Sequence, residues 1–380
     1  MLQLLHILRL GTLLLLCLCW PVFAEKITAV RHTVELNSEL IQQRVPLEVY
    51  LPYNYAADRQ QPYPVLFTTA GDSRFELLQA QIDWLSHTHF SAVPQLVVVR
   101  LPRLSFTGAE ALSDQQYYAL LAKVLRQEVQ PTLNKRFNLA PFSIIEGYSS
   151  RGNVALALLQ HASGHFNAAV ILAPALELQP ADELAKLQQA LKTDSLVNYL
   201  YLSLGNFANN RRHFERLKTA ANTGNKDQSD YHFDDLSTEH YHSSAMIGLE
   251  RGLRYLFADM KVADFSPFVS SGVAGLQAYQ QKLTDKYGYH IDMADNLLGL
   301  GQYFFEQQLP EQAEQAFTLL LSRYPENRLY QLRYAQAMLA AGLTQQAQIQ
   351  LQHTLQLATD AADSELQHYV RQLLTQLQLN

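Results

Sequence analysis

The most informative stretch of the chain is Ile144-Ile145-Glu146-Gly147-Tyr148-Ser149-Ser150-Arg151-Gly152-Asn153-Val154-Ala155. A β-branched run ends in Gly-x-Ser and passes, through a second glycine, into an Ala/Leu-rich helical pattern. This is the layout of a nucleophile elbow, the strand-to-helix turn that lifts a serine hydroxyl clear of an α/β sheet. It departs from the usual Gly-x-Ser-x-Gly at one position, because Arg151 stands where the second glycine is expected and Gly152 follows one residue later.

Short apolar strands alternate with helical patterns on both sides of this stretch. The predicted strands are Thr33–Leu36, Val45–Leu51, Val65–Thr69, Leu96–Leu101, Phe142–Glu146, Ala168–Leu172, Leu200–Leu204 and Tyr231–Asp235. Helices are predicted over Tyr117–Leu125, with Ser113 or Asp114 as N-cap, and over Val154–Gln160. This alternation predicts an α/β fold with a mostly parallel sheet covered on both faces. A dinucleotide-binding sheet is excluded, because no Gly-x-Gly-x-x-Gly follows the first strand.

A repeat begins after about Lys261, where the strand pattern ends and glutamine becomes abundant. One set of positions has the spacing of a tetratricopeptide repeat, and a second set follows 34 residues later. The first set is Leu300, Gly301, Phe304, Ala313, Phe317 and Pro325, and the second is Tyr334, Ala335, Met338, Ala347, Leu351 and Thr359. A generic pair of helical hairpins is the alternative. We expect the flanking helices Ala274–Lys286 and Glu365–Leu377 to cap the repeats, whose groove would bind a protein partner or another copy of the chain.

The first residues have the pattern of a secretory signal peptide. An apolar run, Leu10–Trp20, precedes small residues that predict cleavage after Ala24. A retained anchor is the alternative, although the run is short for a membrane span. Cys17 and Cys19 both lie in this segment, so the exported chain would have neither a disulfide nor a thiolate metal site. We therefore expect a periplasmic or secreted protein with no membrane span after cleavage.

Charge and pattern together define the expected organisation. The formal net charge of −6 gives no indication of nucleic-acid binding, because proteins that bind nucleic acids present a clustered basic surface. We expect a signal peptide over residues 1–24 and an α/β-hydrolase domain over residues 25–260. A linker and first helix would follow over residues 261–290, and an all-α region of tetratricopeptide-like repeats over residues 291–380.

Several segments resemble, in order along the chain, the Putative esterase family of α/β-hydrolase proteins. That family includes siderophore esterases, S-formylglutathione hydrolases, feruloyl esterases and mycolyltransferases. The matching segments are residues 44–52, 63–67, the elbow, 172–175, 201–206, 239–244 and 252–257. The linker Lys286-Tyr287-Gly288-Tyr289 is similar to that of members with a C-terminal tetratricopeptide region. The resemblance implies an α/β-hydrolase fold and ester hydrolysis.

Ester hydrolysis by this route needs a nucleophile, a base, an orienting acid and an oxyanion hole. Ser149 is the nucleophile candidate, and the alternative is a serine that only caps the following helix. Ser150 is a weaker candidate, because the motif requires a glycine two residues before the serine and Tyr148 occupies that position. The N–H of Ser150 would be one oxyanion donor, and the second would come from Gly71 or Asp72 after the strand Val65–Thr69.

The base and the acid come from later segments. The resemblance favours His242 as the base, because Ser244 completes a His-x-Ser pattern, and His240 is the alternative. Related esterases have a carboxylate soon after the Leu-Gly segment, but Asn206 follows Gly205 here. The acid is therefore unknown, with Asp234 and Asp235 as weak candidates, or an asparagine in that role. No third ligand accompanies the two histidines at metal-site spacing, so neither a metal nor another cofactor is expected.

Three arginines have two interpretations: Arg151, Arg100 and Arg103 either are solvated or meet an anionic substrate. Two functions follow from the whole pattern. One is an exported serine esterase that hydrolyses a small-molecule carboxylic ester through a Ser-His acyl-enzyme mechanism. The other is a catalytically weakened esterase-like fold that acts as a binding module, with the helical repeats recruiting a protein partner.

Overall fold

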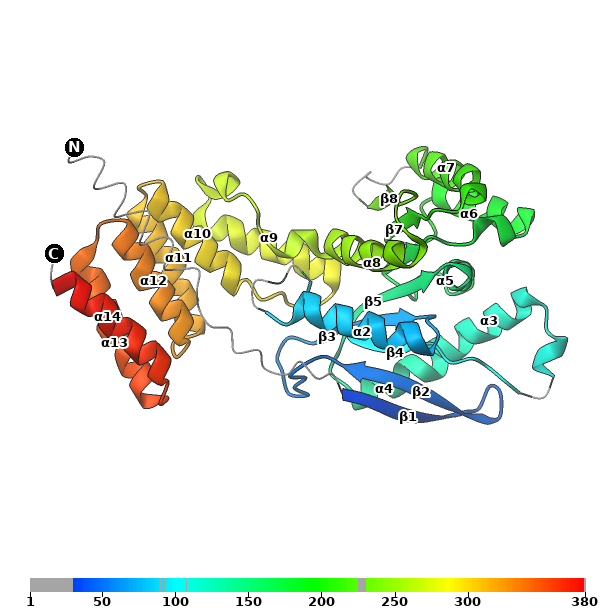
Figure 1. The fold of residues 1–380 in the computed structure, drawn as a ribbon, viewed down its shortest axis with the longest axis horizontal. Coiled ribbons are helices and arrows are strands. Elements are labelled where there is room, and N and C mark those ends of the chain that lie inside the picture. Colours follow the sequence, from blue (N-terminus) through cyan, green and yellow to red (C-terminus); the bar gives the residue numbers. More distant parts are fainter. Residues whose placement is uncertain (1–29, 89–90, 92, 107, 225–229, 379–380) are drawn as a thin grey trace.

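The computed structural model describes residues 30–88, 91, 93–106, 108–224 and 230–378. The predicted signal peptide, residues 1–24, lies outside the described residues. A single eight-stranded sheet forms one half of the molecule, and a group of helices forms the other (Figure 1).

The sheet has the strand order β1-β2-β4-β3-β5-β6-β7-β8. Its strands are β1 (Val30–Ser38), β2 (Gln43–Leu51), β3 (Tyr63–Thr68), β4 (Val97–Arg100), β5 (Leu139–Tyr148), β6 (Ala168–Leu172), β7 (Tyr199–Leu204) and β8 (Tyr231–Asp235). β1 pairs with β2, and β2 with β4, in antiparallel fashion, whereas all the other pairs are parallel. The predicted mostly parallel sheet is confirmed.

Helices cover both faces of the sheet (Figure 1). They are α2 (Asp72–Ser86), α3 (Asp114–Val124), α4 (Gln130–Arg136), α5 (Ser150–His161), α6 (Ala181–Lys192), α7 (Ala208–Asn222) and α8 (Tyr241–Phe257). Short helical turns are η1 (Ala109–Ala111), η2 (Leu125–Val129), η3 (Leu176–Leu178), η4 (Ala258–Met260) and η5 (Ser266–Phe268). Ser113 caps α3 in a capping box with Gln116, as the sequence predicted for this helix start.

The two faces bury separate cores, because successive side chains of a strand point to opposite sides. On β5, Ile145 packs into the core that includes residues of α3, α4, α5, α6 and α7. Its neighbour Ile144 packs into the core of α2 and α8. All six residues of β3 are buried, as expected for a central strand covered on both faces.

The C-terminal half consists of α9 (Gly272–Tyr287), α10 (Ala294–Glu306), α11 (Pro310–Arg323), α12 (Arg328–Ala340), α13 (Thr344–Asp360) and α14 (Ser364–Gln378). The predicted all-helical region is confirmed. It is continuous with the core on the α2 and α8 face of the sheet. Tyr287 of α9 makes this junction: its ring lies 4.9 Å from Phe142 of β5, and its hydroxyl donates to the carbonyl of Leu256 at 2.8 Å.

Candidate active site

The predicted elbow is a sharp turn between β5 and α5. Ser149 connects Tyr148, the last residue of β5, to Ser150, the first residue of α5, with φ 56° and ψ −129°. A positive φ in a non-glycine residue costs energy and persists only where the surroundings impose it. Here the N–H of Ser149 donates to the carbonyl of Leu172 at 2.9 Å, and its carbonyl accepts from the N–H of Gly152 at 2.8 Å. The Ser149 side chain does not cap α5, so the capping alternative is wrong.

The two glycines of the elbow allow close backbone approach. A Cβ on Gly147 would lie 2.5 Å from the carbonyl oxygen of Arg151 and 2.9 Å from Oγ1 of Thr69, so no side chain fits there. A Cβ on Gly152 would lie 3.1 Å from Cβ of Pro174, after β6. Gly152 thus keeps α5 close to the neighbouring strand end, although it stands one residue late in the motif. The Arg151 side chain is exposed and does not crowd the turn.

A buried ion pair lies beneath the elbow. Glu146 of β5 is completely buried, and both of its carboxylate oxygens accept from the guanidinium of Arg74 on α2, at 2.5 and 3.0 Å. The hydroxyl of Thr68 donates to the same carboxylate at 2.6 Å. The Arg74 guanidinium also lies 5.3 Å from the ring centroid of Tyr148. Sequence analysis missed this pair, although a glutamate inside an apolar strand is a signal for a buried partner.

The predicted site residues follow different strands but meet at one edge of the sheet. β3, β5, β6, β7 and β8 are parallel, so their carboxyl ends share that edge, where ligands bind in open α/β sheets. Gly71 follows β3, Ser149 follows β5, and the two histidines follow β8. The ends of β6 and β7 touch, because a Cβ on Gly205 would lie 2.6 Å from Cβ of Ala173.

The histidine segment contacts the elbow through two tyrosines. His240 is the N-cap residue of α8, His242 lies in its first turn, both are exposed, and their ring centroids are 5.9 Å apart. Tyr241, between them, accepts a hydrogen bond through its carbonyl from the hydroxyl of Tyr148 at 2.5 Å. Burial raises the pKa of Tyr148 above its ordinary value, which keeps this hydroxyl a donor. In the described part of the chain, the Ser149 hydroxyl makes no direct hydrogen bond to either imidazole.

The two acid candidates have other partners. Asp234 accepts from the hydroxyl of Tyr201 at 2.6 Å and pairs with Arg251 at 3.1 Å. Asp235 pairs with Arg211 at 2.9 Å, and this guanidinium, together with Ser237, lowers the pKa of Asp235 to about 2. Among the described residues, neither carboxylate bonds to a histidine. Asn206, where related esterases have an acid, is exposed.

The oxyanion candidates lie at two helix N-termini. Ser150 is the first residue of α5, Gly71 is the N-cap of α2, and Asp72 is the first residue of α2. The first amide groups of a helix have no intrahelical acceptor and carry partial positive charge. Amides of this kind stabilise a developing oxyanion when both point at it.

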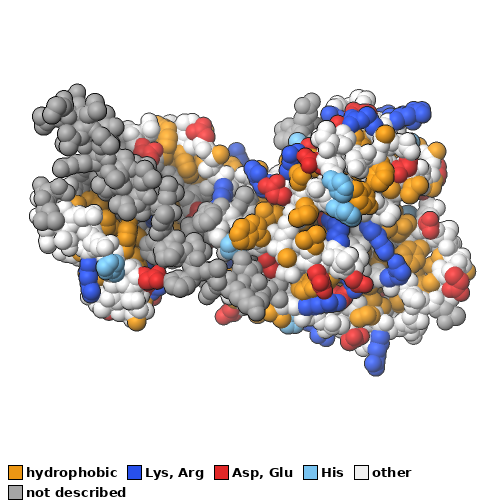
Figure 2. Space-filling model, in the orientation of Figure 1, with side chains coloured by type: hydrophobic (Ala, Val, Ile, Leu, Met, Phe, Trp, Pro, Cys, Tyr) orange, Lys and Arg blue, Asp and Glu red, His pale blue; other side chains and the backbone are white. Residues whose placement is uncertain are grey.

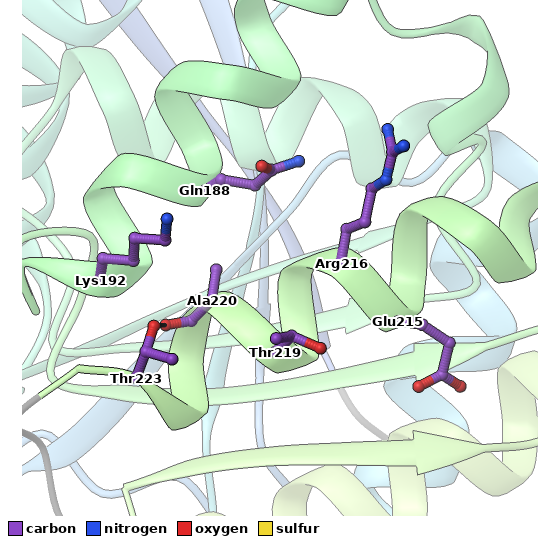
Figure 3. Close-up of a pocket in the computed structure, with 7 residues that line it drawn as sticks. All are labelled: Gln188, Lys192, Glu215, Arg216, Thr219, Ala220 and Thr223. Atoms are coloured by element: carbon purple, nitrogen blue, oxygen red, sulfur yellow. Dashed lines mark hydrogen bonds between the residues drawn. The ribbon is translucent and has the colours of Figure 1, made fainter.

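A hollow of about 680 Å³ adjoins the elbow. Its lining includes Thr69, Gly71 and Asp72 after β3, together with Arg100 and Arg151. On the face shown in Figure 2, basic side chains and histidines gather on the sheet-domain half of the molecule. A separate hollow of about 710 Å³ lies between α6 and α7, lined by Gln188, Lys192, Glu215, Arg216, Thr219, Ala220 and Thr223 (Figure 3). No predicted site residue lines that second hollow, so it does not belong to this site.

Two further features bear on the kind of site. Within the described ranges, no three His, Cys, Asp or Glu side chains cluster as a metal site requires. None of the described helices is both long enough and apolar enough to cross a membrane.

The strand order, the strained serine and the helices on both faces define the α/β-hydrolase class, with the serine elbow at its usual place. Residues 38–246 match the Putative esterase family. Because this match spans more than half of the chain, the protein belongs to that family, and the resemblance noted in the sequence is confirmed. No curated protein matches the chain.

Solved structures share the fold, and two of them illustrate the likeness. An IroE-like serine hydrolase from Shewanella oneidensis is similar with a TM-score of 0.59 and 19% identity, over 77% of this chain and 99% of that one. An uncharacterised protein from Capnocytophaga ochracea DSM 7271 is similar with a TM-score of 0.61 and 14% identity, over 93% of this chain and 100% of that one. At these identities the likeness establishes the fold alone.

Proposed function

We propose that the protein is an exported serine esterase that hydrolyses a small-molecule carboxylic ester. The observation that carries the proposal is the backbone of Ser149, held at positive φ between β5 and α5 at the ligand-binding edge of the sheet. Membership of the Putative esterase family supports it, as does the description of the Shewanella neighbour as a serine hydrolase. Export rests on the predicted signal peptide and implies a periplasmic or secreted location.

The proposed chemistry has two steps. Oγ of Ser149 attacks the ester carbonyl while a histidine, His242 or alternatively His240, accepts its proton. The alcohol leaves with that proton, and the acyl group stays on the serine. Water then attacks the acyl-enzyme, with the same histidine as base, and releases the acid and the free serine. The N–H groups of Ser150 and of Gly71 or Asp72 stabilise the oxyanion in both steps.

The link between Tyr148 and Tyr241 supports the pairing of serine and base. It ties the residue before the nucleophile to the residue between the two histidines, although they are 93 positions apart in the chain. Since Asp234 and Asp235 are held by arginines, we propose a mechanism that depends on the serine and the histidine.

A fluorophosphonate probe tests the proposal. The chain without residues 1–24 should be labelled, Ser149→Ala should abolish labelling, and the neighbouring Ser150→Ala should retain it. Single replacements His240→Ala and His242→Ala identify the base through the loss of labelling rate. An unlabelled wild-type protein, or labelling that survives in Ser149→Ala, would refute the proposal.

The alternative function is a binding module built on a weakened esterase fold. The engagement of both acid candidates by arginines favours it. In that case the folded wild-type protein would hydrolyse no ester and would resist the probe, so the same experiment separates the two functions.

We propose that the C-terminal helices are tetratricopeptide-like repeats that bind a protein partner or a second copy of the chain. α12 begins 34 residues after α10, and α13 begins 34 residues after α11, which is the length of this repeat. At equivalent positions Ala313 and Ala347 are fully buried between paired helices. Analytical ultracentrifugation of the chain tests self-association.

A further inference from the structure

The hollow beside the elbow is unusually rich in arginine. Four guanidinium groups line it: those of Arg44 at the start of β2, Arg100 at the end of β4, Arg103 three residues later, and Arg151 in the first turn of α5. Three separate segments of the chain therefore bring these side chains to one concave surface. Their convergence is a tertiary feature, and it favours an anionic occupant, because clustered like charges repel one another unless a counter-ion lies between them.

The acidic side chains of the same hollow do not neutralise this charge. Its carboxylates are Glu48 and Asp72, and Arg100 pairs with both of them. Arg31 pairs with Glu48 as well. The carboxylates of Glu48 and Asp72 are therefore already paired with Arg100 and Arg31.

The other three arginines are available to a ligand. Arg44, Arg103 and Arg151 are exposed, and within the described part of the chain they form no ion pair. A guanidinium group presents a planar fork of N–H donors that matches a carboxylate or a phosphate bidentately. Two of these arginines, Arg103 and Arg151, also line a second hollow, so they stand where the two spaces meet.

The second hollow has a volume of about 390 Å³ and is more apolar. Besides the two arginines, its lining includes one carboxylate, that of Asp114, and the apolar or aromatic side chains of Leu104, Tyr117, Tyr118, Leu121 and Val154. A molecule with an anionic group next to an apolar or aromatic body would fill both spaces.

Both hollows adjoin the place of the proposed chemistry. Arg151 is two residues from Ser149, and its carbonyl accepts from the hydroxyl of Thr69 at 3.0 Å. Gly71 and Asp72, the candidates for the second oxyanion donor, line the larger hollow. A substituent of an ester held at Ser149 would therefore extend towards Arg151, which lines both hollows.

We propose that the substrate is an anionic ester, with a carboxylate or phosphate bound by Arg103 and Arg151 and with Arg44 lining the same hollow. This inference rests on the proposed esterase function and adds the charge of the substrate. Neither arginine belongs to the acyl-transfer machinery, so their role is binding and specificity.

The test compares esters that differ by one carboxylate. On the acyl side, the pair is 4-methylumbelliferyl valerate and 4-methylumbelliferyl hemiglutarate. On the alcohol side, it is phenyl butyrate and 3-carboxyphenyl butyrate. A hydrogen bond to a charged group contributes enough to change kcat/KM by about 10-fold or more. We expect the anionic member of one pair to be preferred by at least about 10-fold in kcat/KM, and the preference to shrink in 0.5 M salt, which screens exposed charges.

Substitutions of Arg103 and Arg151 test whether these residues cause the preference for anionic esters. Arg103→Gln and Arg151→Gln should each lower the ratio of anionic to neutral kcat/KM by about 10-fold. Arg212→Gln is the matched control, because Arg212 is an exposed arginine on α7 that lines neither hollow. Glutarate and phenyl phosphate, as competing inhibitors, distinguish a carboxylate site from a phosphate site.

The possible failures are distinct. Equal kcat/KM for both members of both pairs overturns the anionic substrate and leaves the esterase intact. A preference that survives in both arginine variants overturns the assignment to these residues. Absence of hydrolysis together with absence of fluorophosphonate labelling overturns the esterase function itself, and this inference with it.

Discussion

Removing Arg74 should destabilise the protein far more than removing an exposed arginine. The carboxylate of Glu146 is fully buried, and Arg74, itself only 19% exposed, supplies its neutralising charge. In Arg74→Met the carboxylate would keep, among its partners in the described part of the chain, only the hydrogen bond from Thr68. Breaking a buried pair by removing one partner typically costs about 3–5 kcal/mol, because a buried charge is left uncompensated. We expect a loss of that size in the free energy of unfolding.

The assay is urea unfolding followed by far-ultraviolet circular dichroism, with midpoints and slopes compared. Arg254→Met is the control: it breaks a pair with Glu250 in which the arginine is 62% exposed, and it should cost at most about 1 kcal/mol. The double variant Arg74→Met/Glu146→Leu removes both charges and should recover most of the loss. The reasoning is refuted if Arg74→Met costs no more than the control, or if the double variant is as unstable as the single one.

Two further predictions concern single side chains. Tyr148→Phe removes the hydrogen bond to the carbonyl of Tyr241. It should slow fluorophosphonate labelling by up to about 10-fold, which is the equivalent of one net hydrogen bond. As a control, Tyr334→Phe on α12 should be labelled at the wild-type rate. Burial raises the pKa of Asp83 from 3.8 to about 6. The folded state therefore binds more protons than the unfolded state between these values, and stability falls as the pH rises through this window. Between pH 4 and pH 7, the free energy of unfolding of Asp83→Asn should therefore fall by about 1–3 kcal/mol less than that of the wild type. Urea unfolding at the two pH values measures this difference, and an unchanged pH dependence would disprove the prediction.

Much of the fold could be predicted from local patterns in the sequence. Ala168–Leu172 was predicted with the bounds that the structure has, because a short apolar run between turns is a local signal. The predicted bounds of Tyr231–Asp235 also match the structure. The Gly-x-Ser turn likewise indicated where β5 ends and α5 begins. The prediction did not include α2, although its buried positions Phe75, Leu78 and Ile82 recur at helical spacing.

The arrangement of the site depended on contacts between distant segments. The sequence indicated a serine, two histidines and a missing acid, since these are residues in a recognisable order. It could not indicate that Arg74 would neutralise Glu146, a partner 72 positions away, or that Asp234 would be held by Arg251.

Local sequence patterns were therefore sufficient to predict the class of fold, the position of the Gly-x-Ser turn and the helical nature of the C-terminal half. The sheet order, in which β4 lies between β2 and β3, depends on the packing of distant segments, and so does the hollow that Arg44, Arg103 and Arg151 line. The physical reason is that periodicity and turn residues report the conformation of neighbouring residues. Charge pairing and cavity shape arise only when strands that are far apart in the chain lie side by side.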